Sequence, residues 1–362
     1  MPTPRQKPIA HAKKLRIDLA LQGGGSHGAF TWGVLDRLLE DERLEIAGIS
    51  GTSAGAMNAV ALAAGLMEGG REGARIALKR FWQRVAESSP FHHFDQWEAN
   101  NPMAALLGPS NPWVQALMAP FQQYAQFVGS QLSPYQLNPL NLNPLRRILE
   151  DTVDFDRVRQ CNRTSLFIAA THVPTGELRI FRQDQLTADM VLASACLPLL
   201  FQAVEVDGEA YWDGGYAGNS ALMPLISETD ADDLLLVQIN PSCRKAVPTQ
   251  ASDILERASE VTFNASLLKE LRTIGLLKEL LEDAGRPDSA YRRPLFKRVD
   301  DLRLHRLDAD DELSQFGASS KTQTSWAFLE QLHGIGYRAA SEWLSAHAKD
   351  LGKRSTYALP SI

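Results

Sequence analysis

The fold is decided by residues 45–66, which read EIAGISGTSAGAMNAVALAAGL. Residues 45–49 predict a buried strand, which ends at the small residues 50–52. Residues 54–66 are small and apolar on every side, a composition typical of a helix that packs closely on a sheet. A strand that leads through a tight turn directly into such a helix indicates an α/β fold.

The flanking segments extend this pattern into a sheet. Residues 17–22 are an apolar run that opens onto three glycines, and apolar residues recur at helical spacing over 29–39. Further strands are predicted at 166–172, 178–181, 203–206, 210–212 and 234–239, with a lone candidate at 302–307. Turn residues join the first four of these into two hairpins. We therefore expect a three-layer α/β/α fold around a mostly parallel sheet.

Composition divides the chain into four parts. Residues 1–16 form a polar, basic tail, and residues 17–240 carry the α/β pattern. Within the latter, residues 88–145 interrupt the regular pattern with proline, asparagine, glutamine and aromatic residues. Residues 241–362 are more charged and predict a mainly helical C-terminal portion, with amphipathic helices at about 250–284 and 324–348.

The overall composition narrows the class of protein. The 362 residues are 44% hydrophobic and carry a net charge of −6, which suits a globular core and gives no sign of nucleic-acid binding. Three cysteines are too few and too scattered for a disulfide framework or a zinc site. The longest apolar runs are about half of the roughly 20 residues that a membrane-spanning helix needs. We expect a cytoplasmic protein whose contact with a membrane, if it has one, is peripheral.

The first chemical motif is Gly51-Thr52-Ser53-Ala54-Gly55, a G-x-S-x-G sequence between a strand and a helix. A serine on such a sharp turn is held with its hydroxyl exposed above the sheet, at the positive end of the helix. The flanking glycines are needed because a Cβ atom would clash with neighbouring elements. A plain tight turn is the alternative, but the strand–turn–helix context favours a nucleophile.

The second motif is a loop made of Gly23, Gly24, Gly25, Ser26, His27 and Gly28. Glycine-rich backbone before a helix points N–H groups at an anion, either a phosphate or a developing oxyanion. Its spacing also fits the G-x-G-x-x-G fingerprint of dinucleotide-binding folds. That fingerprint expects an acidic residue at the end of the second strand, where this chain has Ser50 to Ser53. The nucleotide interpretation is therefore the weaker one.

The third motif is Asp213-Gly214-Gly215 at the end of a predicted strand, followed by Asn219 and Pro224. Taken alone, an aspartate before two glycines is equally well explained as a turn. Its significance comes from its occurrence, in order, with the other two motifs.

Together the three motifs resemble those of the patatin-like phospholipase family, over about residues 17–240 apart from the insertion. Hallmarks of that family are a glycine-rich oxyanion loop, a G-x-S-x-G nucleophile and a D-G-G motif with the aspartate of a Ser–Asp dyad. The resemblance implies that Ser53 is the nucleophile and Asp213 its general base. It further implies that the N–H groups of Gly24 and Gly25 form the oxyanion hole. The helical portion after Asn240 resembles extensions of some bacterial members.

Two positions depart from the family pattern. Gln22 stands where many members have Asp, and His27 where many have Arg or Lys. The second change removes a fixed positive charge beside the oxyanion loop, which puts a preference for phosphate-bearing head groups in doubt.

The resemblance implies a serine hydrolase that needs neither a cofactor nor a metal ion. Its substrate would be a lipid or another acyl ester, cleaved through an acyl-serine intermediate. A thioesterase or a transacylase would use the same dyad, and a phosphate-binding protein that uses the loop at 23–28 is the non-enzymatic alternative. Among the eight histidines, His172, just before a turn, is the best placed to complete a triad instead.

The insertion at 88–145 has an unusual composition. Residues 101–145 contain no acidic or basic residue before Arg146, and aromatic residues and prolines are frequent there. The prolines exclude a single spanning helix. We interpret the segment as a lid that lines an acyl channel and meets lipid surfaces; an ordinary apolar subdomain or a dimer contact is the alternative.

Overall fold

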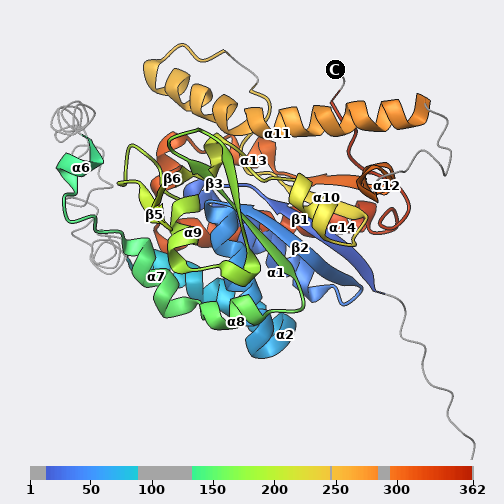
Figure 1. Cartoon of the computed structure of the whole chain (residues 1–362), viewed down its shortest axis with the longest axis horizontal. Helices are drawn as coiled ribbons and strands as arrows, with labels where there is room; N and C mark the ends of the chain where they lie inside the picture. Colours follow the sequence, from blue (N-terminus) through green and yellow to red (C-terminus); the bar gives the residue numbers. More distant parts are fainter. Residues whose placement is uncertain (1–13, 89–132, 245–246, 284–293, 361–362) are drawn as a thin grey trace, which may run out of the picture.

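The computed structural model describes residues 14–88, 133–244, 247–283 and 294–360. Its centre is an eight-stranded sheet in the order β5-β6-β3-β2-β1-β7-β8, with β4 paired to β3 (Figure 1). The strands are β1 (Leu15–Leu21), β2 (Leu44–Thr52), β3 (Ser165–His172), β4 (Leu178–Arg182), β5 (Val204–Val206), β6 (Glu209–Asp213), β7 (Asp233–Val237) and β8 (Arg303–Leu307). Neighbours from β3 through β2, β1 and β7 to β8 are parallel, whereas β4, β5 and β6 pair antiparallel.

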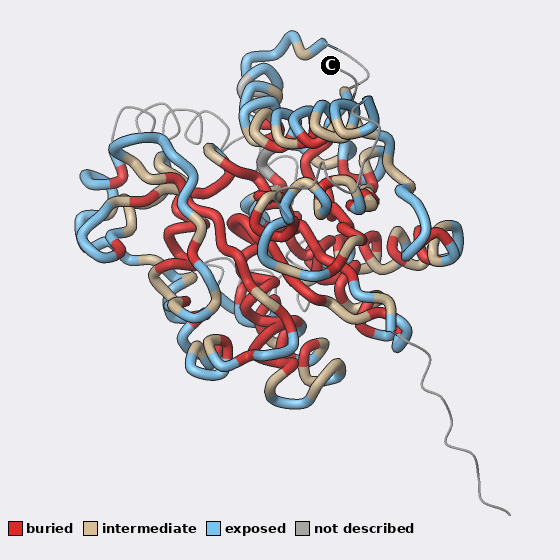
Figure 2. Tube along the Cα trace, turned by 45° about the vertical axis from the view of Figure 1, so that its right-hand side comes forward, coloured by how far each residue is buried: buried red, intermediate tan, exposed pale blue. Residues whose placement is uncertain are grey.

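Helices cover both faces of this sheet. Leu235 and Val237 of β7 belong to a core that includes α1, α2, α9 and α14, while Leu234 and Leu236 belong to a second core with α10, α11 and α12. These helices are α1 (Gly28–Glu40), α2 (Ala54–Glu87), α9 (Ala188–Ser194), α10 (Met223–Glu228), α11 (Ala251–Asp283), α12 (Pro294–Asp301) and α14 (Trp326–His347). Figure 2 shows the buried residues gathered in the interior of the molecule and the exposed ones around it. The predicted three-layer α/β/α architecture is confirmed.

Short helices occupy the connections. They are α6 (Pro134–Leu137), α7 (Pro144–Thr152), α8 (Phe155–Gln160) and α13 (Asp310–Leu313), with single 3-10 turns η1 (Gly25–His27), η2 (Gln183–Gln185), η3 (Gly214–Tyr216) and η5 (Ala318–Thr322). Both predicted hairpins are present, as β3–β4 and β5–β6. In the second hairpin Asp207 and Gly208 both have positive φ, which matches the right-handed twist of the paired strands.

The helix expected at 54–66 extends much further along the chain. α2 reaches Glu87, with non-helical backbone at Gly69 and Gly70, so that two helical pieces join at a kink. Gly70 has φ +64°, a conformation that favours glycine. A Cβ atom on Gly65 would overlap the carbonyl of Gly73, so the two pieces approach closely after the kink. The second piece carries Phe81 and Trp82, which reach the site described below.

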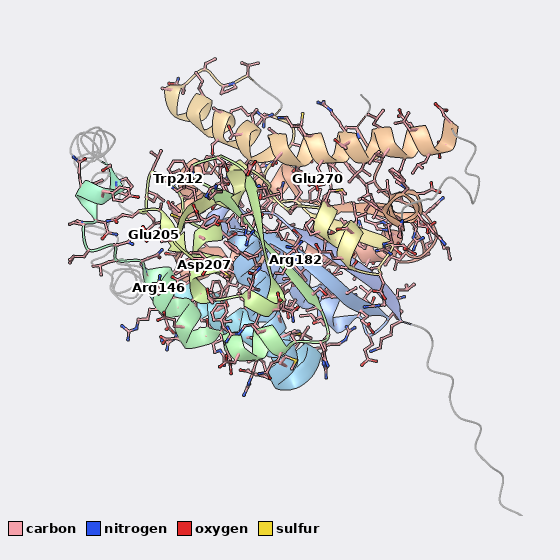
Figure 3. The ribbon with its side chains drawn as sticks, viewed as in Figure 1. Arg146, Arg182, Glu205, Asp207, Trp212 and Glu270 are labelled. Carbon is pink, nitrogen blue, oxygen red and sulfur yellow. The ribbon has the colours of Figure 1, made fainter. Side chains whose placement is uncertain are left out.

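The C-terminal portion joins the same sheet. The strand candidate at 302–307 is β8, which pairs in parallel with β7. α14 packs along α1 at backbone distance, because a Cβ atom on Gly33 would overlap the carbonyl of His333 and one on Gly336 that of Phe30. Glu270, which projects from α11 (Figure 3), accepts hydrogen bonds from the N–H groups of Leu222 (3.0 Å) and Met223 (2.7 Å) at the start of α10. Within the described residues, no helix is long and apolar enough to cross a membrane.

Candidate active site

Ser53 lies on a strained turn between β2 and α2. Its φ of +52° and ψ of −119° are unusual for a residue with a side chain, as expected of a nucleophile elbow. The turn has no room for a side chain at Gly51, because a Cβ atom there would lie 2.7 Å from the carbonyl oxygen of Gly55. The N–H group of Ser53 donates a hydrogen bond to Oγ of Ser194 on α9 (2.9 Å). The tight turn and the Ser194 hydroxyl thus hold the serine in place at the N-terminus of α2.

The sheet places Asp213 beside Ser53, although the two are far apart in sequence. Thr52, the last residue of β2, pairs with Ala169 of β3, and Asp213, the last residue of β6, pairs with Ala170. β4 occupies the other side of β3 at both positions, so β2 and β6 lie along the same side. Because β6 runs antiparallel to β3 and β2 parallel to it, the carboxyl ends of β2 and β6 meet.

The Asp213 carboxyl group is buried, with 1% of the residue exposed. One oxygen, Oδ1, accepts a hydrogen bond from the N–H group of Gly215 (2.8 Å). The other, Oδ2, has no hydrogen-bond partner of good geometry among the described residues. Burial raises the pKa of Asp213 to about 7, while the Gly215 N–H group and the adjacent Ser53 side chain act to lower it. A carboxylate next to the serine hydroxyl, with a pKa near neutrality, is suited to accept its proton.

The glycine loop lies directly against the nucleophile. A Cβ atom on Gly23 would lie 2.6 Å from Cβ of Ser53. The N–H group of Gly23 donates to Oδ1 of Asn219 (2.8 Å), and its carbonyl accepts from Nδ2 of Asn240 (2.7 Å). The N–H groups of Gly24 and Gly25 have no acceptor in the part of the chain that the structure describes. Both glycines line the same cavity as Ser53, so this cavity has two backbone donors in its wall that no described residue uses.

The two positions that depart from the family pattern are buried. Oε1 of Gln22 accepts hydrogen bonds from the N–H groups of Ile239 and Asn240, both at 3.1 Å, and thereby joins β1 to the end of β7. Nε2 of His27 lies 2.8 Å from Oγ of Ser320. Burial, followed by the charge of Lys321, lowers the pKa of His27 to about 4, so its ring is neutral at physiological pH.

A cavity of about 370 Å³ opens above Ser53 and Asp213. Its walls are largely apolar, formed by Met57, Phe81, Trp82, Val85, Leu145, Ala195, Leu197, Leu200, Phe201 and Phe263. Gly24, Gly25, Asn240 and Lys321 contribute to the polar end. A second cavity, of about 320 Å³, lies at the amino ends of the strands beside Leu44 and contains none of the predicted site residues.

Some predicted residues lie away from this site or outside the described residues. His172 is bound to Thr175 and Glu209, both at 2.9 Å, and does not line the cavity. Most of the proposed lid, residues 89–132, lies outside the described residues, and of its remainder Leu145 lines the cavity.

Sequence reasoning did not identify Asn240 or Lys321 as parts of the site. They come from two separate segments and form no local motif, so only the folded chain brings them together.

Comparison with known proteins gives a family match and a similar solved structure. A sequence model of the family described as patatin-like phospholipase matches residues 19–226, which include the glycine loop, Ser53 and Asp213. No curated protein matches the chain. Among solved structures, VipD from Legionella pneumophila is similar at 15% sequence identity with a TM-score of 0.42, over 93% of this chain and 67% of that one.

Proposed function

Because the chain belongs to the patatin-like phospholipase family, whose members are lipid acyl hydrolases, we propose that it hydrolyses carboxylic esters of lipids with Ser53 and Asp213 as its dyad. The observation that carries this proposal is the meeting of the two residues at the ends of β2 and β6, in an apolar cavity. The lining residues suit an acyl chain, and the polar end suits the ester group.

The first half of the reaction forms an acyl-serine. Asp213 accepts the proton of the Ser53 hydroxyl as the oxygen attacks the ester carbonyl carbon. The carbonyl π electrons move onto oxygen, which the N–H groups of Gly24 and Gly25 stabilise. When the carbonyl re-forms, the bond to the leaving alcohol breaks, and that alcohol takes the proton from Asp213.

The second half releases the acid. Asp213 accepts a proton from a water molecule whose oxygen attacks the acyl-serine carbonyl, and the same two N–H groups stabilise the second oxyanion. The Ser53 oxygen leaves and regains the proton from Asp213. An alcohol or thiol in place of water would give transacylation, and product analysis distinguishes these outcomes.

The proposal is tested with Ser53→Ala and Asp213→Asn on p-nitrophenyl esters of increasing chain length and on defined phospholipids. We expect each variant to lose activity by at least about 10³-fold, because each removes a partner of one proton transfer. The exposed variants Ser345→Ala and Asp184→Asn are matched controls and should retain the parent rate. Near-normal turnover by Asp213→Asn would contradict the dyad and direct attention to another base.

The proposal extends to a cytoplasmic protein in which residues 88–145 form a lid that makes peripheral contact with lipid surfaces. Support comes from Leu145 in the cavity wall and from the exposed Leu140 and Leu142 before it. The test replaces Trp113 and Phe121 with serine; both lie in the part outside the described residues. We expect vesicle binding to weaken while short soluble esters are still hydrolysed. An equal loss on both substrates would indicate a structural or dimer element instead.

A further inference from the structure

The cavity contains a cation that originates outside the three motifs. Lys321 belongs to η5 in the C-terminal portion, and its backbone packs against the glycine loop, because a Cβ atom on Gly25 would overlap the Lys321 carbonyl. Its Nζ atom donates a hydrogen bond to Oδ1 of Asn240 (3.1 Å). His27, within the loop itself, is uncharged at neutral pH because of its low pKa. Lys321 therefore supplies positive charge to the loop from another part of the chain.

A continuous chain of polar groups connects this ammonium group to Gly24. Asn240 accepts from Lys321 through Oδ1 and donates through Nδ2 to the carbonyl of Gly23, at 2.7 Å. The peptide bond between Gly23 and Gly24 is trans, so the Gly24 N–H group points opposite to that carbonyl. A bond that fixes the carbonyl consequently fixes the direction of the N–H group. Gly24 lines the cavity and its N–H group has no other acceptor among the described residues.

We propose that Lys321 and Asn240 are positioning residues of the oxyanion hole, which aim and polarise the Gly24 N–H group through the peptide bond of Gly23. This inference rests on the proposed function, because it assigns an oxyanion to Gly24. Successive hydrogen bonds polarise one another in a poorly solvated site, and a cation at one end draws electron density away from the N–H group at the other. The donor thus binds a developing negative charge more strongly than an unassisted amide.

Charged residues around Lys321 hold its side chain close to the loop and leave part of its positive charge uncompensated. Glu260, which is buried, interacts with Lys321 and is also paired with Arg244 (2.6 Å) and Arg257 (3.1 Å). Glu260 attracts Lys321, Arg244 and Arg257, and these three cations share its one carboxylate. Because Glu260 is shared in this way, it offsets the positive charge of Lys321 only in part.

The test compares Lys321→Met with Lys321→Arg, and uses Lys353→Met as a control because Lys353 is exposed in the same C-terminal portion. We expect Lys321→Met to lower kcat about 10-fold with KM changed less than twofold, since a transition-state donor is weakened. The rate of Ser53 labelling by a fluorophosphonate should fall in parallel. Lys321→Arg keeps the positive charge, so its kcat and its labelling rate should both lie between those of Lys321→Met and the parent. If the Met variant does not fold, Lys321→Gln serves as a second neutral variant.

A double-mutant cycle with Asn240→Leu tests the connection itself. Because both changes break one chain of bonds, the double variant should be no slower than Asn240→Leu alone. Additive losses, a change in KM alone, or a kcat of Lys321→Met within twofold of the parent would overturn the inference while leaving the hydrolase proposal intact. A parent protein without labelling at Ser53 would refute the proposed function and the inference together.

Discussion

Removal of the buried charge at Asp213 should stabilise the protein in a way that depends on pH. The Asp213→Asn substitution keeps the size of the side chain and the Oδ1 atom that accepts from Gly215, but removes the ionisable group. An ionised carboxyl group at this buried position is poorly compensated, because Oδ2 has no hydrogen-bond partner of good geometry among the described residues.

The magnitude follows from the pKa. Burial raises the pKa of Asp213 from 3.8 to about 7, which corresponds to about 4 kcal/mol at 1.36 kcal/mol for each tenfold change in the ionisation constant. An acid with a raised pKa holds its proton more tightly in the folded state, so the parent loses stability as the pH rises from 3.8 to about 7. The asparagine variant does not titrate there. It should therefore exceed the parent by about 4 kcal/mol at pH 8 and by less than about 2 kcal/mol at pH 5.

Urea unfolding at both pH values measures this difference directly. Asp184→Asn, which removes an exposed carboxylate, is the control and should change the free energy of unfolding by no more than about 0.5 kcal/mol. If Asp213→Asn were no more stable than the parent at pH 8, or if its advantage were the same at pH 5, the raised pKa and the reasoning built on it would be wrong.

Further predictions concern activity and packing. Since Asp213 must be ionised to accept a proton, kcat/KM should rise with pH and level off above an apparent pKa of about 7; a flat profile from pH 5 to pH 9 would contradict its role as base. Because backbone N–H groups of Gly24 and Gly25 serve the oxyanion, EDTA should leave hydrolysis unchanged, and a loss that calcium restores would refute this. Gly336→Ala should lower the free energy of unfolding by about 1–3 kcal/mol or more, because its Cβ atom would overlap the Phe30 carbonyl where α14 packs on α1. Gly334→Ala on the same helix has space and should stabilise by about 0.5–1 kcal/mol, so thermal unfolding of the pair separates packing from helix propensity.

Local sequence signals predicted the elements that carry the three motifs. The β-branched and apolar runs of β1, β2 and β7, the Asp207–Gly208 turn, and the small apolar residues after Ser53 all formed the expected structures. These features are set by neighbours in sequence, through side-chain periodicity and backbone freedom, and can therefore be read without the fold.

Long-range packing explains what the sequence did not reveal. The extension of α2 beyond Leu66 depends on a kink at Gly69 and Gly70. From the sequence alone, two adjacent glycines are equally compatible with the end of a helix. The surroundings of the glycine loop depend on η5. Its Ser320 is hydrogen-bonded to His27 and its Lys321 to Asn240, and each pair is separated by about 80 or more residues in sequence. The sequence showed that His27 is not a fixed cation, but no local pattern marks Lys321 as the residue that brings charge to the loop.

The proposed reaction depends on Ser53 being a nucleophile that Asp213 activates. The most direct test is labelling of the intact protein with a fluorophosphonate, followed by mass spectrometry of the peptides. We expect one adduct per chain, located on Ser53, absent in Ser53→Ala and formed much more slowly in Asp213→Asn. An adduct on another residue, or labelling of Asp213→Asn at the parent rate, would contradict it.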